Sequence, residues 1–298
     1  MADKALYQQI LAAASGHLAS FAGQTLDVLD VARPSDLEYA IHLSKVISKL
    51  SPMLGNIIEY RVVAELNSNG GKVKGKWVRQ DPGFPDTIFV SDVTPTPGIE
   101  VKTWFPLATE ITARFKDSIT HFSQDQTNVA MLAWLPDHMI YGKPRIIDVW
   151  VDSAKSVAEA RDQHYHNPPD YLVFEPEDCS SRTRNLIQTN TNGYKFQGTA
   201  EQFKEAERIV ASWGKDGKVF DCSSDYQTKI KQLLGRFPYR LDTNFAKMDR
   251  IEHTTLERFK SKVLSTHVNG YSVEEWARIL ANPEQPYSKG IIKSLIGL

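Results

Sequence analysis

Two short motifs place acidic and basic side chains where they could act together on a substrate. Asp86 follows Pro85, and thirteen residues further on Glu100 and Lys102 flank Val101. Two converging carboxylates can hold Mg²⁺ through hard oxygen ligands. A neighbouring ammonium can stabilise the negative charge that develops in a reaction. These residue types suit hydrolysis of a phosphodiester bond, in which a metal polarises the phosphate and lowers the pKa of a bound water.

The flanking sequence predicts two neighbouring strands that carry these groups. Residues 86–91 and 98–104 are rich in strand-forming residues, and a Pro/Thr turn at 94–97 separates them. Glu100 and Lys102 are two residues apart, so both side chains face the same way, while Val101 points into the apolar layer. A hairpin would bring Asp86 beside Glu100. Charged groups in such surroundings are costly unless they are paired or bind a metal.

The rest of the chain predicts an α/β core at about residues 50–175 with helical additions at both ends. One helix is expected at 5–21, one from Ser35 with Glu38 completing a capping box, and one from Ser51-Pro52 to Gly70-Gly71. Further strands are expected at 72–80, 128–135, 145–151 and 171–174. Further helices are expected within 109–122 and at 153–164, 199–213, 226–234, 249–265 and 272–280, with capping boxes at Thr199/Gln202 and Ser272/Glu275.

The pattern Pro85-Asp86 … Glu100-Val101-Lys102 resembles the active site of PD-(D/E)xK nucleases, which include many type II restriction endonucleases. The resemblance covers about residues 50–150. It implies a restriction-endonuclease-like core, in which helices flank a mixed central β-sheet. It further implies Mg²⁺ as the cofactor, with Asp86, Glu100 and Val101 among its ligands and Lys102 as a catalytic residue.

In that family a helix before the PD strand often supplies another glutamate, commonly soon after a glycine. Gly55 and Glu59 fit this description, so Glu59 is expected to join the catalytic and metal-binding residues. Glu65 is the competing candidate. Six residues correspond to about 600° of helical rotation, so the two glutamates cannot both face one site.

Two polar segments are candidates for contacts with DNA. Arg114 and Lys116 follow the Glu100 strand and could contact phosphates near the scissile bond. Residues 180–195 are dense in the side chains that make bidentate contacts to guanine and adenine. We expect this stretch to be a loop that contacts bases. Its candidate residues are Arg182, Arg184, Asn185, Gln188, Asn190, Asn192, Tyr194 and Lys195.

Charge and composition limit the class of protein. Hydrophobic residues make up 41% of the chain and charged residues 24%, as in ordinary soluble proteins. No apolar run reaches the roughly 20 residues that a membrane span needs. The first residues lack a basic region followed by an apolar one, so we expect no secretory signal. Two cysteines do not make a disulfide framework, so we expect a cytoplasmic protein. Residues 180–265 hold 16 Lys/Arg against 10 Asp/Glu, although the whole chain has a net charge of −1.

The resemblance implies a type II restriction endonuclease of a bacterium or archaeon, which cuts double-stranded DNA as a homodimer with two active sites. The chain is expected to form a single catalytic domain: helices at 1–50, the core at 51–175, and a recognition loop with a helical region at 176–298. Two other functions stay open, a structure-specific repair or recombination nuclease and a DNA-binding protein that does not cleave. The motif could also be a cross-strand surface ion pair of small energetic value.

Overall fold

The computed structural model describes residues 5–68, 73–80, 83–107, 122–165, 171–174, 192–217, 223–242 and 253–298. They divide into two compact units. The first unit holds the described residues of 1–111, 120–156 and 253–298, and the second those of 157–252. The C-terminal residues 253–298 belong to the first unit. The single catalytic domain expected from the sequence stays a prediction.

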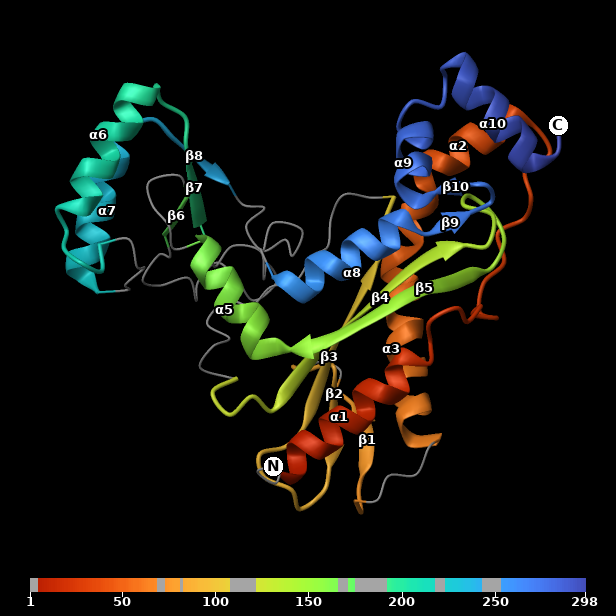
Figure 1. Cartoon of the computed structure of the whole chain (residues 1–298), viewed down its shortest axis with the longest axis horizontal. Coiled ribbons are helices and arrows are strands. Elements are labelled where there is room, and N and C mark those ends of the chain that lie inside the picture. The colour runs from red at the N-terminus through yellow and green to blue at the C-terminus, as the bar shows by residue number, and fades with distance from the viewer. Residues whose placement is uncertain are drawn as a thin grey trace. The chain divides into compact units, whose positions relative to one another are not determined.

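The first unit is built on a five-stranded sheet with the order β1-β2-β3-β4-β5. β3 and β4 are parallel, and the other neighbours are antiparallel, so the sheet is mixed. Helices flank it (Figure 1), which confirms the α/β class. The strands are Lys76–Arg79, Thr87–Val90, Gly98–Trp104, Thr127–Pro136 and Pro144–Ser153.

The N-terminal helices of the first unit are α1 (Leu6–Ala19), α2 (Leu37–Val46) and α3 (Ser51–Ser68). A 3₁₀ turn, Ile47–Leu50, leads into α3. The expected start at Ser35 was wrong by one residue: Asp36 is the N-cap of α2, and its side chain accepts a hydrogen bond from the Tyr39 N–H. Ser and Asp are both good N-caps, so the sequence alone could not choose between them.

The C-terminal part of the first unit comprises α8 (Thr254–Ser265), the short β9–β10 pair, α9 (Val273–Ala281) and α10 (Pro286–Ile296). The capping box predicted for α9 is present. β9 is His267–Val268 and β10 is Tyr271–Ser272. Trp276 of α9 is buried, and its indole N–H donates to the Val268 carbonyl, which fastens the helix to the hairpin before it.

The core of the first unit lies between the sheet and its helices. β4 is buried along almost its whole length, as expected for a strand between two others and covered on both faces. α3 presents one apolar stripe, Leu54, Ile58, Val62 and Leu66, spaced four residues apart. A Cβ atom at Gly55 would lie 3.4 Å from Thr103 Oγ1, so α3 approaches β3 closely at this turn of the helix.

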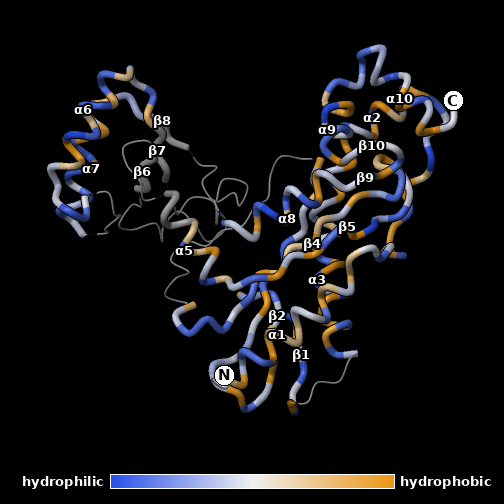
Figure 2. The backbone as a smooth tube through the Cα atoms, in the orientation of Figure 1, coloured by the Kyte–Doolittle hydropathy of each residue, from blue (hydrophilic) through white to orange (hydrophobic). Residues whose placement is uncertain are grey.

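The second unit has its own small sheet, in the antiparallel order β6-β7-β8, and two helices. The strands are Tyr171–Phe174, Asn192–Phe196 and Tyr239–Asp242, and the helices are α6 (Ala200–Ala211) and α7 (Ser224–Arg236). The predicted loop at 180–195 was wrong at its end, because β7 begins at Asn192. Figure 2 shows apolar and polar residues alternating along α6 and α7, as in helices with one buried face.

The chain leaves and re-enters the first unit at two points that lie together. Ser156, within α5 (Ala154–Tyr165), is the last residue before the second unit, and His253 is the first residue after it. Ser156 Oγ lies 3.0 Å from His253 Nε2. A second hydrogen bond joins the same two parts of the chain: the Thr255 hydroxyl donates to Asp152 Oδ2 at 2.6 Å. The ends of the 157–252 segment are therefore held together by groups of the first unit.

The helices that the structure describes include none that is long and apolar enough to cross a membrane.

Asn67, near the end of α3, fixes that helix to the edge strand of the sheet. Its side-chain amide donates to the Trp77 carbonyl at 2.8 Å, and its side-chain oxygen accepts from the Trp77 N–H at 2.9 Å. One side chain thus pairs with the main chain of β1 as a neighbouring strand would. Trp77 itself is buried.

Replacing Asn67 by Ala should lower the free energy of unfolding by at least roughly 1–2 kcal/mol, since its two hydrogen bonds to β1, of about 1 kcal/mol each, are lost. Denaturant unfolding of the variant and the parent measures the difference. Ser68→Ala is the matched control, because the Ser68 hydroxyl donates to the Glu65 carbonyl within the exposed end of the same helix. Equal stability of the two variants would contradict the proposed fastening of α3.

Candidate active site

The site begins where β2 separates from β3. The two strands pair only at Thr87–Ile99 and Ile88–Gly98. Beyond Ile99, the edge of β3 that faces β2 has no paired strand residue. There a side chain contacts the main chain of β3. The Val101 N–H donates to Asp86 Oδ2 at 2.7 Å. The carboxylate of Asp86 thus takes the place of the strand partner that a buried N–H requires.

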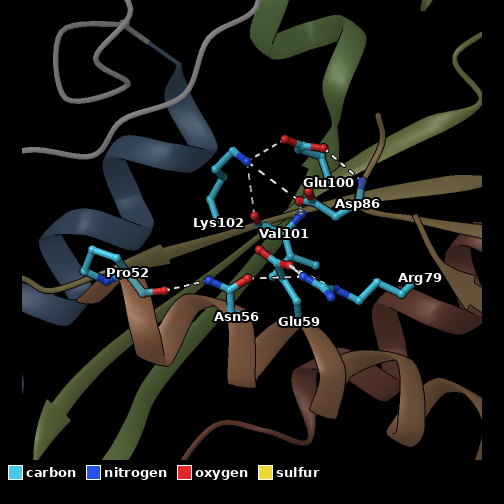
Figure 3. Close-up of polar contacts among 8 residues, drawn as sticks. All are labelled: Pro52, Asn56, Glu59, Arg79, Asp86, Glu100, Val101 and Lys102. Atoms are coloured by element: carbon cyan, nitrogen blue, oxygen red, sulfur yellow. Dashed lines mark hydrogen bonds and ion pairs between the residues drawn. The ribbon is translucent and has the colours of Figure 1, made fainter. Parts of the chain in front are cut away.

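Asp86 and Glu100 lie side by side, as the predicted hairpin required (Figure 3). The Asp86 N–H donates to Glu100 Oε2 at 3.1 Å. Glu100 is 7% exposed, one of few buried charged side chains in the described part of the chain. Each acidic residue therefore accepts a main-chain hydrogen bond at the other strand, which fixes the direction of both carboxylates.

Lys102 completes the cluster. Its Nζ lies 2.5 Å from Glu100 Oε1, 3.2 Å from the Val101 carbonyl oxygen and 3.7 Å from Asp86 Oδ2. Three oxygen atoms, two from carboxylates and one from the main chain, thus surround one cationic atom. The predicted opposite orientation of Val101 is confirmed, since its side chain is buried in the core.

Burial and charge shift the acid–base properties of this cluster. Desolvation raises the pKa of Glu100 above its usual value, and the Asp86 charge adds to this, although Lys102 acts in the opposite direction. For Lys102, burial is the largest single influence and disfavours the ammonium. The combined attraction of Glu100, Asp86 and Glu59 outweighs burial, so the pKa of Lys102 is raised. Lys102 therefore stays protonated at neutral pH.

Glu59 reaches the site from α3 and is held by Arg79, the last residue of β1. Arg79 Nη2 and Nε donate to Glu59 Oε2 at 3.0 and 3.3 Å. Arg79 Nη2 also donates to Asn56 Oδ1 at 3.2 Å. The charge of Glu59 acts on Lys102, which favours Glu59 over Glu65 as the helical carboxylate of the site.

The residues fit a hard divalent cation in type. Carboxylate oxygens of Asp86 and Glu100 and the Val101 carbonyl oxygen converge on the Lys102 ammonium. Such oxygens are the ligands that Mg²⁺ takes. Within the described residues, however, no three His, Cys, Asp or Glu side chains come together as a metal cluster. Glu59 bonds to Arg79, so its place among the metal ligands stays a prediction.

Ten residues are predicted from the sequence to contact DNA. Arg114, Lys116, Arg182, Arg184, Asn185, Gln188 and Asn190 lie outside the described residues, and Asn192, Tyr194 and Lys195 lie on β7 of the second unit. The role of all ten residues in DNA contact stays a prediction.

Arg79 and Asn56 are site residues that the sequence analysis missed. Asn56 and Glu59 are three residues apart and so share a face of α3. This spacing could have indicated a common partner, but nothing in the sequence identifies that partner as Arg79.

No protein-family model matches this chain, and neither do curated proteins or solved structures.

The raised pKa of Glu100 predicts a measurable titration. The NMR chemical shift of the Glu100 side-chain carboxyl carbon, followed against pH without divalent metal, should show a titration midpoint above the usual pKa near 4.5. In Lys102→Met the midpoint should rise further, because the attraction that lowers the pKa is removed. Ionisation of Glu100 then disfavours folding: its contribution to stability is full below about pH 4.5 and is lost as pH rises through the raised pKa.

Lys289→Met is the control for this titration, since Lys289 is an exposed lysine of α10 that pairs with Glu284. It should leave the Glu100 midpoint in place. A Glu100 midpoint at or below the usual value, or one that Lys102→Met lowers, would show that burial does not dominate at this carboxylate.

Proposed function

We propose that this protein is a Mg²⁺-dependent endonuclease that hydrolyses phosphodiester bonds in double-stranded DNA. The observation that carries the proposal is the cluster at the free edge of β3, where Asp86, Glu100 and Val101 present three oxygen atoms around the Lys102 ammonium. A mixed sheet flanked by helices, with this cluster on adjacent strands, is also the arrangement that the PD-(D/E)xK resemblance leads us to expect.

Each side chain has a distinct part in this proposal. Asp86 and Glu100 hold the cation, and each is oriented by a main-chain N–H of the other strand. When bound, Mg²⁺ would polarise the phosphate and lower the pKa of a water. The Val101 carbonyl adds a neutral oxygen ligand that β3 holds in a fixed direction.

Lys102 acts as a hydrogen-bond donor rather than as a general base. Its raised pKa keeps it an ammonium at the pH of the reaction. An ammonium cannot accept a proton from the attacking water. It can orient that water by donating a hydrogen bond to a lone pair of the water oxygen. It also stabilises negative charge on the phosphate as the bond to the leaving oxygen breaks.

We further propose a restriction-type enzyme that reads a DNA sequence. Residues 180–265 hold 16 Lys/Arg against 10 Asp/Glu. This excess of basic residues gives that part of the chain the positive charge that phosphate contacts need. Cutting both strands of a symmetric site calls for two active sites, so the active form would be a homodimer. Such an enzyme would work in the cytoplasm of a bacterium or archaeon.

Purified protein incubated with phage DNA and Mg²⁺ should give discrete fragments, and EDTA should prevent them. Asp86→Ala should abolish cleavage, and Lys102→Ala should slow it on the order of 10²-fold or more, because transition-state charge stabilisation is lost. Gel electrophoresis of a time course measures both. Arg278→Ala is the matched control: Arg278 is an exposed residue of α9, paired with Glu274, and should leave the rate unchanged.

Other results of the same digest separate the alternatives. Nicking that depends on branched or damaged DNA would favour the structure-specific nuclease. Binding without cleavage, with Mn²⁺ as well as Mg²⁺ and on several DNAs, would contradict the proposed hydrolysis and favour a DNA-binding protein.

A further inference from the structure

Arg79 links three elements that meet at the candidate site. It ends β1, where it pairs with Thr87 of β2. The next residue, Gln80, donates its N–H to the Asp86 carbonyl at 2.8 Å, so the β1–β2 ladder extends to the catalytic aspartate itself. The Arg79 side chain leaves this ladder and reaches α3. The guanidinium therefore connects β1, the strand that pairs with β2, with the helix that carries Glu59.

The contacts of Arg79 form a fork on one face of α3. Two of its nitrogen atoms donate to a single oxygen, Glu59 Oε2, and one of them also donates to Asn56 Oδ1. Asn56 is fixed in turn, since its Nδ2 donates to the Pro52 carbonyl at 3.0 Å. Figure 3 shows this chain of groups beside the Lys102 cluster. A guanidinium fork of this kind gives a fixed direction that a lysine could not give.

An ordinary surface ion pair would explain these contacts less well. Exposed pairs contribute little, because both side chains lose freedom and water screens the charges. Here the side chains of Arg79 and Glu59 are 31% and 23% exposed, and a third residue shares the guanidinium. The charge of Glu59 also acts on Lys102, so the position of this carboxylate affects the catalytic cluster.

We propose that Arg79 is a positioning residue, which fixes the Glu59 carboxylate on the face of α3 near Lys102 and so supports the cation site formed by Asp86 and Glu100. This inference rests on the proposed nuclease function. Arg79 acts through Glu59 and does not itself touch the substrate or the cation. Without the fork, the Glu59 side chain is free to turn into solvent, and its charge no longer supports the cation site.

The test is a double-mutant cycle between Arg79→Met and Glu59→Gln, with two readouts. The first is binding of Mn²⁺ alone, followed by electron paramagnetic resonance. The second is the single-turnover rate of DNA cleavage at saturating Mg²⁺. Each single variant should weaken Mn²⁺ binding and slow cleavage on the order of tenfold, the usual effect of removing a group that orients a ligand.

The double variant should be no worse than Glu59→Gln alone, because a residue that positions Glu59 has no further effect on the site once that carboxylate is removed. Arg79→Lys, which keeps the charge but loses the fork, should fall between the parent and Arg79→Met. The matched cycle uses Arg278→Met and Glu274→Gln, an exposed pair on α9, and should change neither readout. Thermal unfolding of each variant shows that the protein is still folded.

The possible results are distinct. Additive effects of the two substitutions, or an Arg79→Met variant that behaves as the parent, would overturn the positioning role while leaving the nuclease in place. Tighter Mn²⁺ binding by Arg79→Met would also overturn it, because Arg79 would then compete with the cation for Glu59. If the parent binds Mn²⁺ but cleaves no DNA, the proposed function fails, and the cycle in Mn²⁺ binding still decides the role of Arg79. A parent that binds no Mn²⁺ overturns both.

Discussion

The hydrogen bond from the Val101 N–H to Asp86 holds the candidate site together. β2 leaves β3 after two residue pairs, so the next main-chain N–H on that side of β3 needs another acceptor. A buried N–H without a partner costs free energy comparable to a lost hydrogen bond, and the Asp86 carboxylate removes that cost. The same bond directs Asp86 toward Glu100 and turns the Val101 carbonyl toward Lys102. One contact therefore both satisfies the sheet edge and orients the site.

Charge balance is the second constraint on this region. Asp86, Glu100 and Glu59 bring three negative charges near one another, and Lys102 and Arg79 bring two positive charges. Burial of Glu100 would be unfavourable without these partners. The remaining excess is negative, which suits a site for a divalent cation. Two cationic side chains hold the acidic groups in place: Lys102 of β3 contacts Glu100 and Asp86, and Arg79 of β1 contacts Glu59.

The sequence was informative where local patterns decide the structure. The turn at 94–97 and the two-residue spacing of Glu100 and Lys102 predicted the hairpin and the shared face, and both are confirmed. The β3 boundaries also agree, because Gly98 and Trp104 end a run of strand-forming residues. The capping boxes of α6 and α9 were predictable for the same reason: each depends on residues within four positions of one another.

Long-range pairing decided the features that the sequence did not reveal. β7 lies in a polar stretch, and it is a strand because β6 and β8, distant in sequence, pair with both of its edges. The Arg79–Glu59 contact joins residues twenty positions apart on a strand and a helix, so no periodicity indicates it. The return of 253–298 to the first unit depends on packing against the core, which composition does not show.

The short distance between Ser156 and His253 has a consequence for how such a protein could diversify. The 157–252 segment leaves and returns at almost one point, so its length is not set by the geometry of the first unit. Descendants of this chain could lengthen, shorten or exchange the segment while β3 and its carboxylates stay unchanged. Under the proposed function, recognition of new DNA sequences could evolve without rebuilding the chemistry.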